Sequence, residues 1–137
     1  MERPPLRGQC QLVLDLTGVG RPVGELFAEA GLDPIGVTIT GGFSWHRERR
    51  HDWHVAKSVL VSTTQKFLSS ERLVIAKSLP HAGLLKKELR DFRVKISKSG
   101  NETYEAREGQ HDDLLLSLCC ALFVAEHPGR RWQPVGS

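Results

Sequence analysis

Two adjacent carboxylates, Asp112 and Asp113, follow His111 at the start of a long apolar run over residues 114–126. A run of this length that is apolar on almost every side predicts a buried helix. The first turn of a helix carries unpaired N–H groups and a partial positive charge, so one carboxylate there would serve as an N-cap. Capping needs only one aspartate, and the second carboxylate beside a histidine leaves a chemical role open.

A further carboxylate, Asp15, stands at the end of a short apolar strand predicted for residues 11–16. A glycine turn and a helix over residues 22–30 follow it, and the β-branched residues 35–40 predict a second strand. A strand, a helix and a strand within this length indicate a βαβ unit with parallel strands. Asp15 and Thr40 would then lie at one edge of the sheet, where open α/β sheets hold their ligands.

If the last helix packs beside the first strand, Asp15 converges with Asp112 or Asp113. Clustered carboxylates repel one another unless a cation lies between them. Hard oxygen ligands suit Mg²⁺ or Mn²⁺, and two such ions about 4 Å apart would support phosphodiester hydrolysis. We therefore predict that these three aspartates are metal ligands and catalytic residues, with Asp15 within about 8 Å of Asp112 or Asp113. Thr17 and His111 are candidates for hydrogen bonding to those ligands without binding the metal themselves.

Residues 43–54, predicted to be a loop, mix three arginines, three histidines and two tryptophans. Flexible cations interleaved with aromatic rings suit a phosphate backbone and unstacked bases. The alternatives are a solvated loop whose tryptophans pack back on the core, and a metal cluster at residues 51–54, which lacks further ligands. The predicted DNA-binding residues are Arg47, Arg49, Arg50 and Lys57, with Arg130 and Arg131 near the C-terminus.

The rest of the chain predicts further elements of an α/β protein. Helices are expected over residues 55–68 and 81–92, a third strand over 72–76 and a hairpin over 94–107. Together with the elements above, they predict a mixed sheet of about five strands with helices on both faces.

Composition narrows the class of protein. The chain has 137 residues, 39% of them hydrophobic, which predicts one domain with a core over about residues 10–126 and an irregular basic tail over 127–137. A net charge of +3 permits a polyanionic partner. The sequence contains neither a CxxC motif nor a membrane-length apolar run, and no apolar segment of a signal peptide follows Met1. Its three cysteines are expected to be reduced thiols in a cytosolic compartment.

Five stretches, taken together and in order, resemble the C-terminal nuclease domain of tailed-phage terminase large subunits. The order and spacing match over about residues 10–126. The stretches are Val13-Leu14-Asp15-Leu16-Thr17-Gly18-Val19-Gly20-Arg21-Pro22-Val23, Val37-Thr38-Ile39-Thr40-Gly41-Gly42, Val55-Ala56-Lys57, Arg72-Leu73-Val74-Ile75-Ala76 and Gly109-Gln110-His111-Asp112-Asp113-Leu114.

The resemblance implies a ribonuclease H-like fold and a Mg²⁺- or Mn²⁺-dependent endonuclease that cuts concatemeric viral DNA during packaging. It implies Asp15 as the metal ligand at a strand end and Asp112 or Asp113 as the ligand on the last helix, with Asp113 preferred. Double-stranded DNA, the terminase ATPase domain, the small terminase subunit and the portal would be partners, with no membrane involved. The protein would act in the cytoplasm of a bacterial host and be encoded by a phage or prophage.

The chain departs from the family pattern at its start. Family domains begin with a further β-hairpin region whose first strand bears another catalytic aspartate, whereas here nine residues precede the matched region and Glu2 is their only acid. We therefore expect an N-terminally truncated or split domain without the ATPase part. The alternative function is a catalytically incomplete DNA-binding or assembly fragment. A nucleotide-binding role for the GxGxxxG pattern at Gly18, Gly20 and Gly24 is a third hypothesis.

Overall fold

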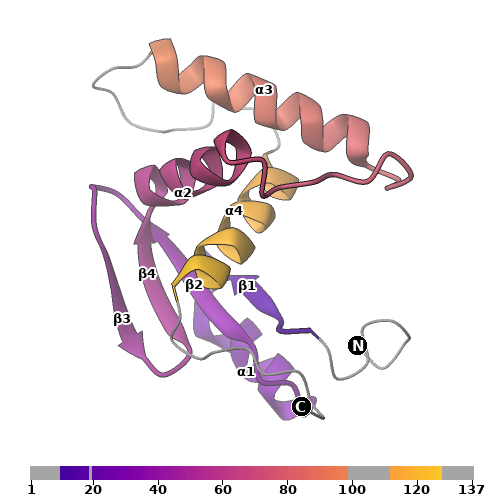
Figure 1. Ribbon diagram of the computed structural model, residues 1–137. Coiled ribbons are helices and arrows are strands. Elements are labelled where there is room, and N and C mark those ends of the chain that lie inside the picture. The colour runs from indigo at the N-terminus through magenta and orange to yellow at the C-terminus, as the bar shows by residue number, and fades with distance from the viewer. Residues whose placement is uncertain (1–9, 19, 99–111, 128–137) are drawn as a thin grey trace.

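The computed structural model describes residues 10–18, 20–98 and 112–127, with only the backbone described over 93–98. These residues form a four-stranded sheet and four helices (Figure 1). The α/β class is as predicted, although the described part has four strands rather than about five. In chain order the elements are β1 (Val13–Asp15), α1 (Gly20–Glu29), β2 (Ile35–Thr40), β3 (Trp45–Arg49), β4 (Asp52–Ala56), α2 (Lys57–Ser69), α3 (Ala82–Lys98) and α4 (Asp113–Glu126).

The predicted βαβ unit is confirmed. β1 and β2 pair in parallel, with Leu14 opposite Gly36, and α1 connects them. The turn into α1 needs left-handed backbone, which Gly18 supplies at φ 79° and Gly20 at φ 67°. Gly36 admits the Leu16 side chain, because an added Cβ would lie only 2.5 Å from Leu16 Cδ1. These glycines therefore let the chain turn sharply after β1 and pack closely against β2.

The prediction of a loop over residues 43–54 is wrong, because this stretch forms the hairpin of β3 and β4. β4 pairs in parallel with β2 and antiparallel with β3, so the strand order is β1-β2-β4-β3. Trp53 and Val55 alternate inward along β4 and are buried, while the His54 between them is less buried. The charged residues of β3 obscured this two-residue periodicity in the sequence.

Two other predicted strands are wrong. Residues 72–76 are irregular, and Val74 in their middle is 84% exposed, so this apolar run does not enter the sheet. The strand expected at the start of the 94–107 hairpin is the last part of α3, which continues to Lys98. Once a helix has formed, each added residue gains a hydrogen bond at a small cost in free energy. The extension of α3 is therefore favoured over a short strand with an alternating pattern. The remainder of that hairpin, 99–107, lies outside the described residues.

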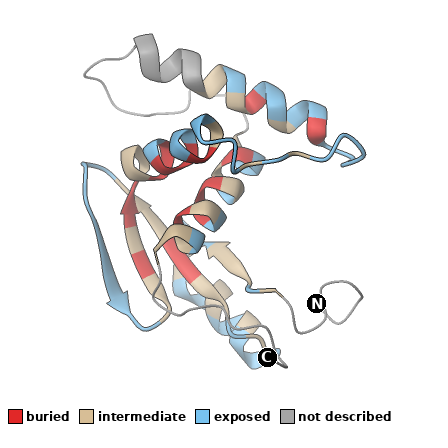
Figure 2. Cartoon of the chain, viewed as in Figure 1, coloured by how far each residue is buried: buried red, intermediate tan, exposed pale blue. Residues whose placement is uncertain are grey.

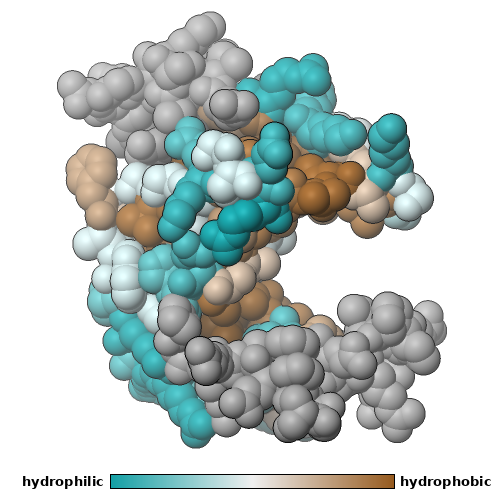
Figure 3. All heavy atoms as spheres, viewed as in Figure 1, coloured by the Kyte–Doolittle hydropathy of each residue, from teal (hydrophilic) through white to brown (hydrophobic). Residues whose placement is uncertain are grey.

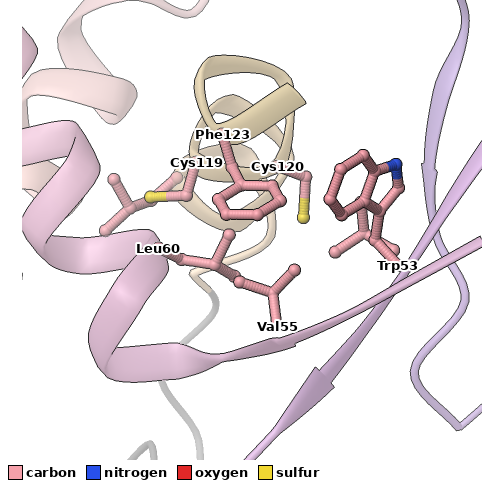
Figure 4. Close-up of a cluster of buried hydrophobic side chains, with 8 residues drawn as sticks. Trp53, Val55, Leu60, Cys119, Cys120 and Phe123 are labelled. Carbon is pink, nitrogen blue, oxygen red and sulfur yellow. The ribbon is translucent and has the colours of Figure 1, made fainter. Parts of the chain in front are cut away.

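The predicted last helix is confirmed as α4, and its buried side holds the core together. Figure 2 shows the buried residues gathered where α4 meets the sheet and α2, and Figure 1 shows α1 on the opposite face of the sheet. The core side chains interlock in Figure 4, with Phe123 and the two cysteines of α4 against strand β4 and α2. The cluster consists of Val37, Trp53, Val55, Leu60, Leu115, Cys119, Cys120 and Phe123.

The cysteines of α4 lie in an apolar environment that suppresses their ionisation. Cys119 and Cys120 are each 1% exposed, and none of the three cysteines, all of which the structure describes, forms a disulfide. Burial raises the pKa of Cys120 to about 12, with a smaller contribution from the negative charge of Asp15. Burial also raises the pKa of Cys119, although the hydroxyl of Thr64, 3.1 Å from its sulfur, opposes that shift.

We expect these two thiols to resist a thiol reagent in the native protein, because only the thiolate attacks. At pH 8, DTNB should titrate about one thiol, the half-buried Cys10, and all three after unfolding in guanidinium. The Cys10→Ser variant should then show almost no native reaction. Rapid reaction of two or more native thiols in the wild type would contradict the burial of α4.

Candidate metal and nucleic-acid site

Asp15 ends β1 on the side of the sheet that α4 covers. Val13, two residues earlier, packs against the core cluster, and side chains two apart on a strand share a face. Leu16 points the other way, toward Gly36 and Gly24 of α1. Helix α4 packs directly against β1. The predicted meeting of the first strand and the last helix therefore occurs on one face of the sheet.

Thr17 supports Asp15 through its backbone. The Thr17 N–H donates to Asp15 Oδ1 at 2.8 Å, while the Thr17 hydroxyl oxygen accepts from the N–H of Ile39 at 2.8 Å. The residue therefore orients the carboxylate and ties the turn after β1 to β2. Thr40 lies at the same end of the sheet but farther along, because Asp15 pairs with Val37; three residues of strand span about 10 Å. His111 lies outside the described residues.

The start of α4 is capped by a residue that the sequence analysis did not single out. Asp112 occupies the N-cap position but makes no side-chain capping hydrogen bond. Instead, Glu88 Oε2 from α3 accepts the N–H of Leu115 at 2.9 Å, and Glu88 is only 8% exposed. The sequence indicated the burial of Glu88 only by spacing. Glu88 lies three residues after Leu85 and four before Phe92, which places it on the inward side of the helix.

Asp112 pairs with a lysine from the start of α2. Lys57 Nζ lies 3.7 Å from Asp112 Oδ2, and these side chains are 16% and 17% exposed. The ammonium also lies 5.7 Å from the centre of the Phe92 ring. A DNA phosphate would have to compete with this pair for Lys57, whose DNA contact stays a prediction. Asp113, in the first turn of α4, is exposed.

The donor chemistry fits a hard divalent cation only in part. Carboxylate oxygens are the ligands that Mg²⁺ prefers, and one or two of them are enough when substrate phosphate supplies others. Within residues 10–18, 20–98 and 112–127, however, no group of three or more His, Cys, Asp or Glu side chains could hold a metal. A complete cage made by the described residues is therefore absent, and the predicted approach of Asp15 to Asp112 or Asp113 stays a prediction.

The histidines at residues 51–54 have separate partners. His54 Nε2 lies 2.8 Å from Glu48 Oε2, and His51 Nε2 lies 3.8 Å from Asp33 Oδ1. The hydrogen bond from His54 lowers the pKa of Glu48, and the nearby positive charges add to that shift. The first contact lies within the hairpin, between β4 and β3, and the second joins the hairpin to the residues before β2; in the described residues the alternative metal cluster has no support.

The arginines of the hairpin differ in their contacts within the protein, and so in how they could contact a DNA phosphate. Arg47 Nε donates to the carbonyl oxygens of Arg49 at 3.2 Å and Arg50 at 3.1 Å, and its guanidinium lies 5.3 Å from the Trp53 ring centre. Arg47 therefore braces the turn of the hairpin. Arg49 and Arg50 are exposed. Arg130 and Arg131 lie outside the described residues.

The two tryptophans of the hairpin pack on the core, as the alternative interpretation of this stretch predicted. Trp45 and Trp53 lie 5.5 Å apart between ring centres, and both contact the ring of Phe123. Trp53 is 6% exposed, so it cannot stack on a base without unfolding the hairpin, whereas Trp45 keeps 43% of its surface exposed. The basic surface of the hairpin is therefore formed mainly by Arg49 and Arg50.

No described helix is long and apolar enough to cross a membrane; even α4, the most apolar, has 14 residues. Comparison of the chain with protein-family models, with curated proteins and with solved structures found no match.

Proposed function

We propose that this chain is part of a Mg²⁺- or Mn²⁺-dependent endonuclease domain of the phage terminase type, with a ribonuclease H-like fold, acting on double-stranded DNA. One observation carries the proposal: Asp15 ends β1 on the face covered by α4, while Asp112 at the N-cap of α4 makes no side-chain capping hydrogen bond and Asp113 lies in the first turn. Carboxylates from a strand end and a helix start would suit a cation-dependent site if they shared one ion.

The chain's own residues would prepare such a site before a metal or DNA arrives. The backbone of Thr17 orients Asp15, Lys57 holds Asp112 and Glu88 fixes the first turn of α4. Asp15 and Asp113 would hold the cations, with Asp112 as the alternative ligand. Bound cations would supply an activated water and stabilise the leaving 3′-oxygen.

A second function is a DNA-binding or assembly fragment without activity of its own. The absence of a three-donor group among the described residues favours it. The terminase ATPase domain, the small subunit and the portal are the partners proposed for either function, in the cytoplasm of a bacterial host and encoded by a phage or prophage.

Nicking of supercoiled plasmid with Mn²⁺, compared with a reaction containing EDTA, tests the proposed function. Metal-dependent nicking supports the nuclease. DNA binding without nicking supports a DNA-binding fragment, and failure to bind or cut DNA contradicts both the nuclease and the DNA-binding fragment and leaves the assembly fragment. A rise in melting temperature with NAD or ATP would instead favour the nucleotide-binding hypothesis.

The salt dependence of DNA binding should identify the contacting arginines. Each phosphate contact releases counterions, so the double variant Arg49→Ala/Arg50→Ala should reduce the slope of log K against log salt by about 2. Arg47→Ala should alter that slope less and lower thermal stability more, because Arg47 braces the hairpin. Fluorescence anisotropy with a labelled duplex measures the slopes. An unchanged slope in the double variant would mean that the hairpin is merely solvated.

A further inference from the structure

Two histidines face each other across the hairpin of β3 and β4. His46 of β3 pairs in register with His54 of β4, and their rings stack with centres 4.9 Å apart and planes 14° apart. Glu48, two residues after His46, shares its side of β3. Trp45 and Trp53 pack against α4 on the other side of the hairpin, because neighbouring residues of a strand point to opposite faces.

The histidine pair lies on a polar and accessible part of the surface. Figure 3 shows mainly hydrophilic residues along the margin where Figure 1 draws β3. His46 is exposed, and the side chain of His54 keeps 29% of its surface exposed. Both rings can therefore meet an ion from solution without any opening of the core.

Glu48 determines which nitrogen of His54 is available to a ligand. His54 Nε2 lies 2.8 Å from Glu48 Oε2, and an ionised carboxylate only accepts, so Nε2 carries a proton. In the neutral ring Nδ1 then keeps a lone pair. The same hydrogen bond lowers the pKa of Glu48, which keeps its carboxylate ionised. A carboxylate in this position fixes a metal-binding histidine and makes its other nitrogen more basic.

We propose that His46 and His54 form a binding site for a borderline divalent cation, Zn²⁺, Ni²⁺ or Cu²⁺, with water completing its coordination. Imidazole nitrogen suits these ions, whereas Mg²⁺ and Mn²⁺ prefer carboxylate oxygen. A metal lies in the plane of each imidazole that binds it, so one of the stacked rings must turn. The exposed ring of His46 can do so, because the torsion between an imidazole and its Cβ is soft.

Glu48 supports this site and is not a third ligand. Its other oxygen, Oε1, lies 3.7 Å from the guanidinium of Arg21 on α1, so both carboxylate oxygens have partners. This arrangement agrees with the lack, in the described part of the chain, of three His, Cys, Asp or Glu side chains that could hold a metal. The site lies on the face of the sheet away from α4, and the inference does not rest on the nuclease proposal.

Titration with Zn²⁺, followed by the NMR signals of the imidazole rings, tests the site. The Cys10→Ser protein is used, because the half-buried Cys10 thiol is a competing ligand for Zn²⁺. The signals of His46 and His54 should shift together and saturate. Mg²⁺ at the same concentration should leave both signals in place.

Variants of the hairpin distinguish the proposed ligands from their neighbours. Glu48→Ala should weaken Zn²⁺ binding by about tenfold, and Glu48→Gln by less, because the amide oxygen can still accept from His54 Nε2. His46→Ala removes a ligand and should weaken binding at least as much; because His46 is exposed, the fold should survive. His51→Ala is the matched control, since His51 belongs to the same hairpin but lies near Asp33.

Three results would overturn the inference. The first is no shift of the His46 and His54 signals at millimolar Zn²⁺. The second is Zn²⁺ binding that is unchanged in His46→Ala. The third is an equal loss of binding in His51→Ala, which would place the ion elsewhere on the hairpin.

Discussion

Replacing Asp15 or Asp113 by asparagine is expected to reduce Mn²⁺-dependent nicking by orders of magnitude. Each change removes one negative charge and one strong oxygen ligand from a site that would need both to hold a hard cation. The comparison is made by plasmid nicking at equal protein and metal concentrations, on the wild type and the two variants. Isothermal titration with Mn²⁺ alone gives a second measurement that does not depend on DNA.

Both variants should keep their fold, which makes a loss of activity interpretable. The amide oxygen of Asn in place of Asp15 can still accept the Thr17 N–H. The Leu115 N–H at the start of α4 is satisfied by Glu88, so Asp113→Asn should cost at most about 1 kcal/mol. Glu25→Gln on the exposed side of α1 is the matched control, because it makes the same change of charge away from the site.

The outcomes separate the two proposed functions. Nicking by the wild type that falls in both variants and persists in Glu25→Gln supports the nuclease. Robust nicking in all variants would place the active site elsewhere or indicate a contaminant. Nicking in none of the proteins, including the wild type, would favour the non-catalytic function.

Replacing Phe123 by alanine is expected to lower the free energy of unfolding by about 3–5 kcal/mol. Its ring is fully buried and contacts Trp45 at 5.7 Å, Trp53 at 5.6 Å and His127 at 4.1 Å between ring centres. Its loss would leave a cavity where the hairpin, the sheet and α4 meet. Because a domain is stabilised by only about 5–15 kcal/mol, this single change could remove most of its stability.

Urea unfolding followed by tryptophan fluorescence measures this loss. Phe123→Leu should cost less than the alanine change, because a smaller volume is lost. Leu26→Ala on α1 should change stability by at most about 0.5 kcal/mol, since Leu26 is 64% exposed. A loss below about 1 kcal/mol for Phe123→Ala would contradict the central position of that ring.

Local patterns in the sequence were enough to predict several elements of this protein. The βαβ unit, the helices and the burial of α4 follow from glycine turns, short apolar runs and helical spacing, all of which act over a few residues. The sequence also places Asp15 at a strand end and Asp112 and Asp113 at a helix start. These features depend on neighbouring residues, so no knowledge of distant contacts was needed.

Which segments join the sheet was determined by tertiary contacts that those local patterns do not specify. The hairpin of β3 and β4 is in the sheet because Trp45 and Trp53 pack on Phe123, far away in sequence. Residues 72–76 resemble a strand but find no partner strand in the described sheet, and Arg72 instead bonds Glu126 at 3.2 Å. β pairing depends on an available neighbour, which short-range propensity does not specify.

The roles of the charged residues were likewise decided by packing. Lys57 and Arg47 are predicted to contact DNA, and only the fold shows that Lys57 also pairs with Asp112 and that Arg47 bonds to the turn of the hairpin. Glu88, one charge among several on an amphipathic helix, caps α4 across a gap of 27 residues. A charged group is stabilised by whichever partner lies within a few ångströms, and the fold alone determines which partner that is.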